Sequence, residues 1–408
     1  IQAILDGKAD NDVLNSLLIL TGMTWKEIDV LRAYRNYFFQ LGYHFTMASF
    51  HQALINHPHV ARYLYEYFEV RFRPYSTWSD PGLREEQALF PLRMKLLESI
   101  EKVSGINDDR ILRTLFNLID ATVRSNFHVR RDLDDYFISF KVNSLGVIDM
   151  PAPRPQYEIY VHAADMEGIH LRGGLISRGG IRWSDRPDDF RTEILGLMQT
   201  QMSKNALIVP KGAKGGFVVK KQREGESFKE AGKRAYITLI RGLLDLTDNY
   251  DRDKVVRLPG IVNYDHNDPY IVVAADKGTA QFPDIANSVA GEYRYWLGEA
   301  FASGGSKGYN HKGLGITARG AWESVKRHFR EIGRDIQTEP FTTIGIGSMD
   351  GDVFGNGMLL SHQTRLLAAI SGEHIFIDPD PVDSEESFLE RKRLFEMPGS
   401  SWDDYDRG

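Results

Sequence analysis

The spacing of apolar residues divides the chain into segments with different periods. Up to about residue 135 the apolar positions recur at helical spacing, and Thr24 with Glu27 forms a capping-box pattern before a segment that stops at Gly42. Further helical patterns cover residues 49–72, 86–104 and 108–126. No group of polar residues with ligand-binding spacing interrupts them. We therefore predict a helical scaffold region over residues 1–135.

Alternating apolar positions replace the helical period near residue 136. YFISFKV and YEIYVHA have the alternation and the aromatic content of strands, with PAPRP as a connector between them. Helices are predicted at residues 188–206, 229–248, 282–301 and 317–333, with a strand at IVVAA between the second and the third. Strands that alternate with helices indicate an α/β domain, which we place at residues 136–337.

A second α/β unit is predicted from residue 338 onwards. It comprises a strand at 341–346, a glycine-rich turn, a helix from about 357 to 370 and a strand at 374–378. The predicted fold class is therefore α/β, with an N-terminal helical region, a central α/β domain and the first part of a Rossmann-type domain at 338–408. Because the chain starts at Ile1 and stops soon after this unit begins, we expect it to be a fragment of a longer polypeptide.

Composition excludes several classes of function. The 408 residues include no cysteine, which excludes disulfides, thiolate metal sites and cysteine nucleophiles. A formal net charge of −6 without a dense basic run does not favour nucleic acid or a membrane surface as a partner. The longest apolar stretches are too short to cross a bilayer, no signal peptide is visible, and the histidines show no metal-ligand spacing. We therefore expect a cytoplasmic protein and predict no metal site.

The segment SRGGIRWSDR could bring a backbone close to a ligand. Gly179 and Gly180 remove side-chain bulk, and Arg178 and Arg182 supply fixed positive charge. The alternative for this segment is a solvated loop.

Two lysines follow in neighbouring segments. Lys204 lies seven residues after Leu197 and so near the inward face of its helix, where it would meet an anion or complement the helix dipole. In VPKGAKGGFVV we predict a turn between two strands, with Lys214 held among glycines. Crowding by Lys204 and Lys211 would favour a neutral, reactive amine, whereas the alternative is a solvated lysine. A P-loop is excluded because no Ser or Thr follows the lysine.

Asp276 and Thr317 occupy positions at which ligands gather in α/β proteins. Asp276 follows the strand IVVAA at its carboxyl end, although an aspartate there also serves as a cap for the next turn. Thr317 is a good N-cap for the helix at 317–333 and would offer a hydroxyl to a bound cofactor.

The glycine-rich turn has the pattern of a dinucleotide site. Gly345, Gly347 and Gly351 follow a strand and precede a predicted helix, whose N-terminus would hold a pyrophosphate. Asp378 ends the next predicted strand, where an acidic residue accepts hydrogen bonds from the ribose and repels a 2′-phosphate. The pattern therefore favours NAD over NADP.

Together these segments resemble the glutamate dehydrogenases, in particular the large bacterial NAD-specific type. The resemblance covers nearly the whole chain and is carried by RGGIRWSDRPDDFRTEILGLMQTQMSKNALIVPKGAKGGF, DPYIVVAADKGTA, FASGGSKGYNHKGLGITARGAWESVKRHFRE and GDVFGNGMLLS. It implies NAD as cofactor, L-glutamate and 2-oxoglutarate as substrates, a substrate-binding role for the central domain, and a homo-oligomer, which we expect to be a tetramer.

The resemblance also implies roles for single residues. Lys214 looks like the catalytic lysine and Asp276 like the aspartate that shuttles protons. Arg178, before the Gly-Gly pair, looks like the residue that holds the substrate γ-carboxylate, although small hexameric members have lysine there. Lys204 resembles the lysine that binds the α-carboxylate, and Thr317 the threonine near the nicotinamide.

The implied reaction is oxidative deamination of L-glutamate, with hydride passing to NAD. Arg178 and Lys204 would clamp the two carboxylates, Lys214 would activate water, and Asp276 would relay protons. Two alternatives stay open. One is a dehydrogenase of leucine, valine or phenylalanine, whose apolar pocket would leave Arg178 unpaired, and the other is a non-catalytic regulatory homologue.

Overall fold

The computed structural model describes residues 1–74, 77, 80–308, 311–347, 349, 351, 353–381 and 383–406. The described residues form two compact units, Ile1–Gly305 and Ser306–Gly408. The domain boundaries placed near residues 135 and 337 stay predictions. None of the helices in the described ranges is long and apolar enough to cross a membrane.

The first unit begins with helices, as predicted. They are α1 (Gln2–Leu5), α2 (Leu17–Thr21), α3 (Trp25–Gln40), α4 (Met47–Asn56), α5 (Pro58–Phe72), α6 (Pro81–Arg84), α7 (Phe90–Glu101), α8 (Ile106–Asp120) and α9 (Phe127–Arg130). The capping box of α3 is confirmed, because the Thr24 N–H donates to Glu27 Oε2 at 2.6 Å and the Glu27 N–H donates to Thr24 Oγ1. Gly42 follows the end of α3 with φ +80°, which only glycine adopts without strain.

One predicted helix is too long. The pattern at 108–126 was expected to be helical throughout, but α8 ends at Asp120 and residues 122–125 form strand β1. β1 pairs antiparallel with the next strand and therefore joins the helical region to the main sheet.

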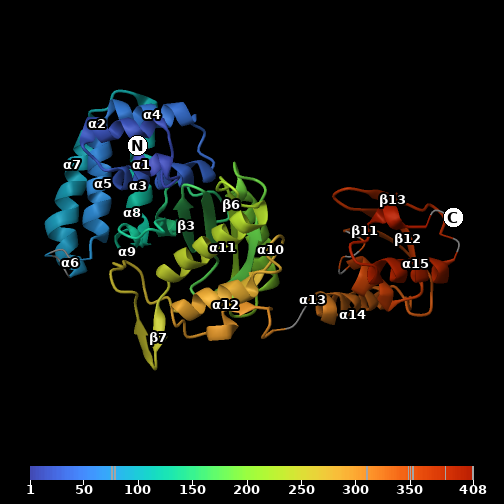
Figure 1. Cartoon of the computed structure of the whole chain (residues 1–408). Helices are drawn as coiled ribbons and strands as arrows, with labels where there is room; N and C mark the ends of the chain where they lie inside the picture. The colour runs from blue at the N-terminus through green and yellow to red at the C-terminus, as the bar shows by residue number, and fades with distance from the viewer. Residues whose placement is uncertain are drawn as a thin grey trace. The chain divides into compact units, whose positions relative to one another are not determined.

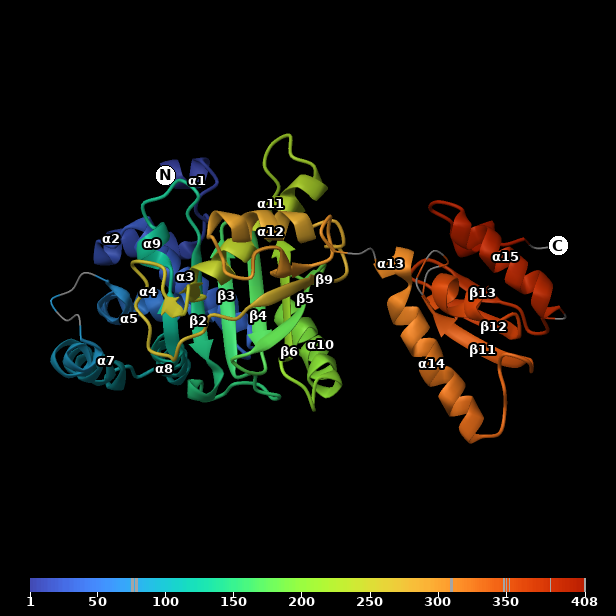
Figure 2. The same cartoon turned by 90° about the horizontal axis from the view of Figure 1, so that it is seen from below.

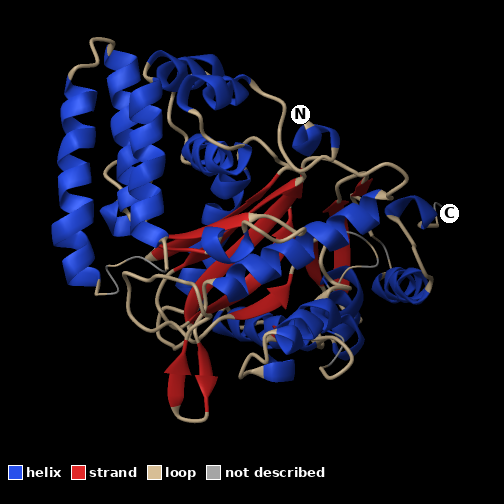
Figure 3. Ribbon diagram, turned by 60° about the vertical axis from the view of Figure 1, so that its left-hand side comes forward, coloured by secondary structure: helices blue, strands red, loops and turns tan. Residues whose placement is uncertain are grey.

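The described part of the first unit holds an eight-stranded sheet in the order β1-β2-β3-β4-β6-β5-β9-β10. The strands are β1 (Thr122–Ser125), β2 (Ile138–Asn143), β3 (Tyr157–Ala163), β4 (Met166–Arg172), β5 (Ser177–Trp183), β6 (Lys211–Val219), β9 (Val272–Ala275) and β10 (Ala302–Ser303). Pairs from β1 to β6 are antiparallel, whereas β6, β5, β9 and β10 run parallel. The predicted α/β class is confirmed. A separate hairpin, β7 (Asn249–Asp251) and β8 (Lys254–Val256), projects from this unit (Figure 3).

Helices cover both faces of the sheet. α10 (Phe190–Lys204) lies on one face, and α11 (Phe228–Asp245) with α12 (Pro283–Glu292) lies on the other (Figures 1 and 2). On the α10 face, Tyr34 of α3 stacks on Phe140 of β2 with ring centroids 4.3 Å apart. The core of the helical region and the core of the sheet are therefore continuous on this face.

The segment around Lys214 differs from the prediction. A turn between two strands was expected at 210–216, but β6 is one continuous strand from Lys211 to Val219, and Leu207, Ile208 and Val209 are exposed loop residues. The segment SRGGIRW, for which a loop was the alternative, is strand β5. The prediction was wrong because it took the glycines as turn formers.

Packing explains these glycines. A Cβ on Gly212 would lie 2.7 Å from the backbone nitrogen of Met202, and a Cβ on Gly216 would lie 2.4 Å from Ile194 Cδ1. Both neighbours belong to α10. The glycines therefore let α10 lie directly on β6, and this close packing sets the helix beside the residues of β5 and β6 that face it.

A buried ionic network holds the segment that precedes β9. Lys141 Nζ donates to Asp265 Oδ2 at 2.5 Å and to Asp268 Oδ2 at 2.7 Å, and Arg172 also pairs with Asp268. Arg124 Nε donates to Asp265 Oδ1 at 2.6 Å. Burial raises the pKa of Asp268, but the two cations outweigh it and lower the pKa to about 2.

The second unit contains α13 (His311–Leu314), α14 (Ile316–Glu331), β11 (Phe341–Ile346), a π-helical turn η5 (Val353–Gly357), a 3₁₀ turn η6 (Met358–Leu360), β12 (Thr364–Ile370), β13 (Ile375–Ile377) and α15 (Ser384–Glu396). The helix predicted at 357–370 is wrong, because the helical segment ends at Leu360 and Thr364–Ile370 forms a strand. β12 runs parallel to β11, and β13 runs antiparallel to β12. The strand–helix–strand unit therefore consists of β11, the short helical segment η5–η6 and β12.

We expect Gly212→Ala to destabilise the protein by about 1–3 kcal/mol, because its methyl group would displace the backbone of α10. Gly196→Ala is the matched control, since nothing lies within 4 Å of a Cβ at this exposed position of α10. This control should stabilise the protein by roughly 0.5–1 kcal/mol. Urea unfolding measures both, and equal midpoints for the two variants would contradict the packing role of Gly212.

Candidate active site

Charged side chains of the parallel strands β5 and β6 meet Asp276 where the short strand β9 ends. Asp276 directly follows β9, and Lys214 lies within β6. Lys214 Nζ and Asp276 Oδ2 are 2.6 Å apart, with 12% of the lysine side chain and 23% of the aspartate side chain exposed. A half-buried lysine paired with a carboxylate is an arrangement suited to proton transfer.

Strand β5 lies between the strand that carries Lys214 and the strand that leads to Asp276. A Cβ on Gly180 would lie 3.2 Å from Lys214 Nζ and 3.2 Å from Asp276 Cβ. Gly179 is tighter still, because its Cβ would lie 1.6 Å from the carbonyl oxygen of Ala213. Both glycines of SRGGIRW are therefore required by close approach rather than by a turn.

Arg182 connects Asp276 to α10. Arg182 Nε donates to Asp276 Oδ2 at 3.1 Å, and Arg182 Nη1 donates to Glu193 Oε1 at 3.0 Å. Ser184 Oγ donates to the other Glu193 oxygen at 2.6 Å. Burial lowers the pKa of Arg182, but its two carboxylate partners raise it by more.

The backbone around Asp276 is also fixed. The Asp276 N–H donates to Thr279 Oγ1 at 3.0 Å, and this hydroxyl donates to the Ile181 carbonyl at 2.8 Å. Burial raises the pKa of the Asp276 carboxyl, but Lys214 and Arg182 outweigh burial and hold the pKa below its ordinary value of 3.8. Asp276 is therefore a carboxylate at neutral pH.

The two predicted carboxylate-binding residues lie at the surface. Arg178 is exposed on β5. Because side chains two residues apart in a strand lie on the same face, Arg178 shares a face with Gly180 and Arg182. Lys204 is the last residue of α10 and is exposed, which differs from the inward position predicted for it. Neither has an ion pair with another residue in the described part of the chain.

Sequence reasoning assigned no role to Glu193 or Ser184 and took Arg182 only as a fixed positive charge. The strand alternation of SRGGIRW could have found Arg182, because residues 178, 180 and 182 share a face once the segment is a strand. Glu193 gives no such sequence signal, because its partner is set by how α10 packs on the sheet.

The residues predicted to bind a dinucleotide lie in the second unit. Thr317 was expected to cap its helix, but the N-cap is Gly315, and Thr317 lies exposed in the first turn of α14. Gly315 lies against Asn356 of the helical segment that follows the glycine-rich turn. Thr317 therefore lies at a helix N-terminus beside that segment.

The glycine-rich turn packs on the segment that follows it. A Cβ on Gly345 would lie 2.6 Å from the ring of Phe354, and one on Gly347, with φ +153°, would lie 3.2 Å from it. Gly351 follows, and the Gly355 N–H donates to its carbonyl at 2.9 Å. This close strand-to-helix packing between parallel strands fits a dinucleotide-binding turn.

Asp378 is not brought to that turn. It follows the antiparallel strand β13, and its N–H donates to the carbonyl of Leu367 in β12 at 2.8 Å. It therefore lies beside the middle of β12 rather than at its carboxyl end. The acidic residue after the carboxyl end of β12 is Glu373, in the turn between β12 and β13.

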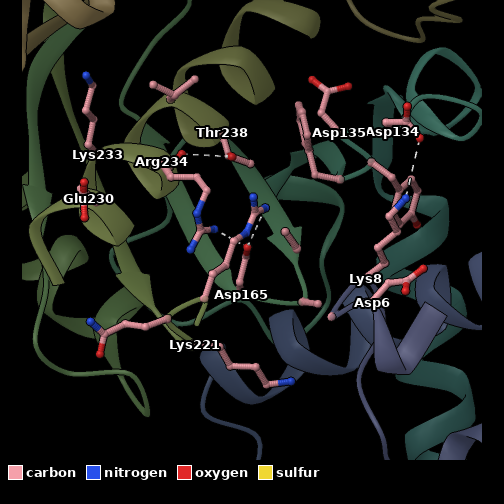
Figure 4. Close-up of a pocket in the computed structure, with 18 of the residues that line it drawn as sticks. Asp6, Lys8, Asp134, Asp135, Asp165, Lys221, Glu230, Lys233, Arg234 and Thr238 are labelled. Atoms are coloured by element: carbon pink, nitrogen blue, oxygen red, sulfur yellow. Dashed lines mark hydrogen bonds and ion pairs between the residues drawn. The ribbon is translucent and has the colours of Figure 1, made fainter. Parts of the chain in front are cut away.

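A large cleft of about 920 Å³ lies elsewhere in the first unit, between α1, the β3–β4 turn and α11 (Figure 4). It is lined by six acidic and six basic residues, several of which are paired, such as Arg234 with Asp165. None of Arg178, Lys204, Lys214 or Asp276 lines it. Its balanced charge favours no class of ligand.

Comparison with known proteins gives concordant matches. A family model described as bacterial NAD-glutamate dehydrogenase, catalytic domain, matches residues 95–408, and one described as glutamate dehydrogenase, helical motif 3, matches residues 9–74. The NAD-specific glutamate dehydrogenases of Halomonas elongata and Pseudomonas aeruginosa are each 48% identical to the chain over 99% of its length. The chain covers 25% of either protein, and so spans about a quarter of the relatives it matches. A solved hetero-hexameric glutamate dehydrogenase from Thermus thermophilus (Leu bound form) has 16% identity and a TM-score of 0.38, over 80% of this chain and 65% of that one.

We expect Asp276→Asn to reduce stability at neutral pH and to matter less in acid. Because the folded pKa is lowered, the carboxylate contributes stability above its unfolded pKa, and that contribution is lost as pH falls through the folded pKa. The measurement is the difference in free energy of unfolding between wild type and variant, at about pH 7 and about pH 3. Asp185→Asn, at an exposed site, should show little pH dependence. A pH-independent difference for Asp276→Asn would contradict the lowered pKa.

Proposed function

This chain belongs to the bacterial NAD-glutamate dehydrogenase family, and on that premise we propose that the full polypeptide oxidatively deaminates L-glutamate to 2-oxoglutarate and ammonia with reduction of NAD. The observation that carries the proposal is the Lys214–Asp276 pair, 2.6 Å apart, with Asp276 directly after the carboxyl end of β9. A cytoplasmic location and assembly as a homo-tetramer remain predictions.

Lys214 and Asp276 divide the proton transfers. NAD, when bound, accepts the hydride from the α-carbon, which leaves an iminium on the substrate. Lys214 must be neutral to activate the attacking water, and Asp276 Oδ2 is close enough to take its proton. The amine then takes a proton from water as the hydroxyl adds to the α-carbon. Asp276 returns a proton to the nitrogen and is again a carboxylate. As the carbinolamine collapses to the ketone, the nitrogen leaves as ammonia and Asp276 takes the hydroxyl proton.

Arg178 and Lys204 are proposed to hold the substrate. Arg178 would pair with the γ-carboxylate and Lys204 with the α-carboxylate, which fixes the α-carbon relative to Lys214. Their exposure supports this role, because both cations are available to the two carboxylates of an incoming substrate. Gly179, next to Arg178, is buried against the Ala213 carbonyl, and its proposed contribution to substrate binding is to let β5 approach β6 at this point.

The second unit is proposed to hold NAD. Gly345, Gly347 and Gly351 would line the pyrophosphate site, with the Thr317 hydroxyl near the nicotinamide. The role expected of Asp378 falls more naturally to Glu373, which follows the carboxyl end of a parallel strand. An acidic side chain there would accept hydrogen bonds from the adenosine ribose and disfavour NADP.

In the full-length polypeptide, Lys214→Ala should lower kcat for glutamate-dependent NADH formation by about 10²–10⁴-fold, because the variant cannot activate water. Lys229→Ala is the control, since Lys229 is an exposed lysine of α11 outside the site. Absorbance of NADH measures both. Turnover by Lys214→Ala at the wild-type rate would remove Lys214 from the mechanism and favour a non-catalytic role for this site.

Substrate choice tests Arg178. The wild-type polypeptide should prefer glutamate to leucine, and Arg178→Leu should lower kcat/KM for glutamate by about 10²-fold, or ~2.7 kcal/mol, without lowering that for leucine. Steady-state assays with both amino acids and NAD measure this. A wild-type preference for leucine would instead indicate a dehydrogenase of apolar amino acids and would overturn the role of Arg178.

A further inference from the structure

The Arg182 guanidinium donates hydrogen bonds to two different carboxylates. Nε donates to Asp276 Oδ2 at 3.1 Å, and Nη1 donates to Glu193 Oε1 at 3.0 Å. The side chains are mostly buried, with 21% of Arg182, 23% of Asp276 and 13% of Glu193 exposed. Arg182 is therefore a rigid connection between a residue at the end of β9 and a residue on α10.

Glu193 is itself fixed from the other side. Ser184, which is buried, donates to Glu193 Oε2 at 2.6 Å, so both carboxylate oxygens of Glu193 have a partner. The chain Ser184–Glu193–Arg182–Asp276 thus fixes the orientation of Arg182 as well as its charge. A lysine could not reproduce this connection, because it lacks the planar fork that reaches two carboxylates.

We propose that Arg182 is a positioning residue that, together with Glu193 and Ser184, holds the Asp276 carboxylate against Lys214 without binding the substrate. This inference rests on the proposed function. The torsion that turns a carboxylate is soft, so one ion pair alone leaves Asp276 free to rotate away when Lys214 gives up its proton. Arg182 donates to the same oxygen, Oδ2, and keeps it in place through that step.

The charged groups around Asp276 set the direction of the pH effect. Lys214 faces it from β6 and Arg182 from β5, while Glu193 of α10 lies behind Arg182 and Lys277 follows in its own loop. Loss of Arg182 removes a donor and a positive charge, which raises the pKa of Asp276. Activity that requires the carboxylate is lost as pH falls through this raised pKa, so the acidic limb of the pH profile moves to higher pH.

The test uses the full-length polypeptide with Arg182→Met, Arg182→Lys, Glu193→Gln and the double variant Arg182→Met/Glu193→Gln. Arg182→Met should lower kcat by about 10- to 100-fold and leave KM for glutamate within about threefold, because geometry is lost and binding is not. The acidic limb of its pH profile of kcat/KM should move to higher pH. Arg182→Lys should recover only part of kcat. The double variant should be no slower than Arg182→Met, because Glu193 acts only through Arg182.

Arg186→Met is the matched control, since Arg186 is an exposed arginine of the next loop that pairs with Asp189. Its kinetics should equal those of wild type. Thermal unfolding checks that each variant is folded. If Arg182→Met is not, Glu193→Gln carries the test: it keeps the charge of Arg182 but loosens its orientation, so kcat should fall by less, with KM for glutamate unchanged and no comparable acidic shift.

Three results would overturn the inference: a KM raised tenfold or more with unchanged kcat, full activity of Arg182→Met, or additive losses in the double variant. Each of these leaves an active wild-type glutamate dehydrogenase and so leaves the proposed function standing. A wild-type polypeptide without glutamate-dependent turnover would instead overturn the proposed function, and with it this inference.

Discussion

The close approach of β5 to β6 is the constraint on which the site depends. At Gly179 there is no room for any side chain, because a Cβ would lie 1.6 Å from the Ala213 carbonyl. At Gly180 the missing side chain leaves the space in which Lys214 meets Asp276. Parallel pairing of β5 with both β6 and β9 then places the lysine and the aspartate on the two sides of one strand. The Lys214–Asp276 pair therefore depends on how closely the strand backbones pack.

Two further features hold Asp276 in place from outside the pair. The buried cations Arg124, Lys141 and Arg172 bind the aspartates of the segment that leads into β9. Such buried ion pairs add little net stability against an apolar alternative, but breaking one leaves an uncompensated charge. Thr279 holds the backbone after the strand. Both ends of the segment that presents the aspartate are thus fixed by polar contacts that only the folded chain can make.

The sequence predicted correctly those features that depend on residues close together in the chain. The capping box at Thr24, the alternation of β2 and β3 and the α/β class all follow from neighbours within a few residues, and each is confirmed. Lys214 was placed in a turn because glycine and proline favour turns locally, whereas α10 requires those glycines for contact across the sheet. Likewise Thr364–Ile370 has helix-forming leucines and alanines, but parallel pairing with β11 makes it a strand. Lys214 and Asp276 were candidates from local patterns, and the resemblance supplied their roles. The link through Arg182 and Glu193 needed the packed fold.

The candidate site contains both exposed and mostly buried charged side chains. Arg178 and Lys204 are exposed, whereas only 12% of the Lys214 side chain is. Mobile salt ions screen exposed charges over about 8–10 Å but act far less on partly buried pairs. Ionic strength should therefore weaken anion binding at Arg178 and Lys204 more than it weakens the Lys214–Asp276 ion pair. Salt sensitivity in this unit is therefore set at its exposed cations, while the Lys214–Asp276 pair is largely insulated from salt.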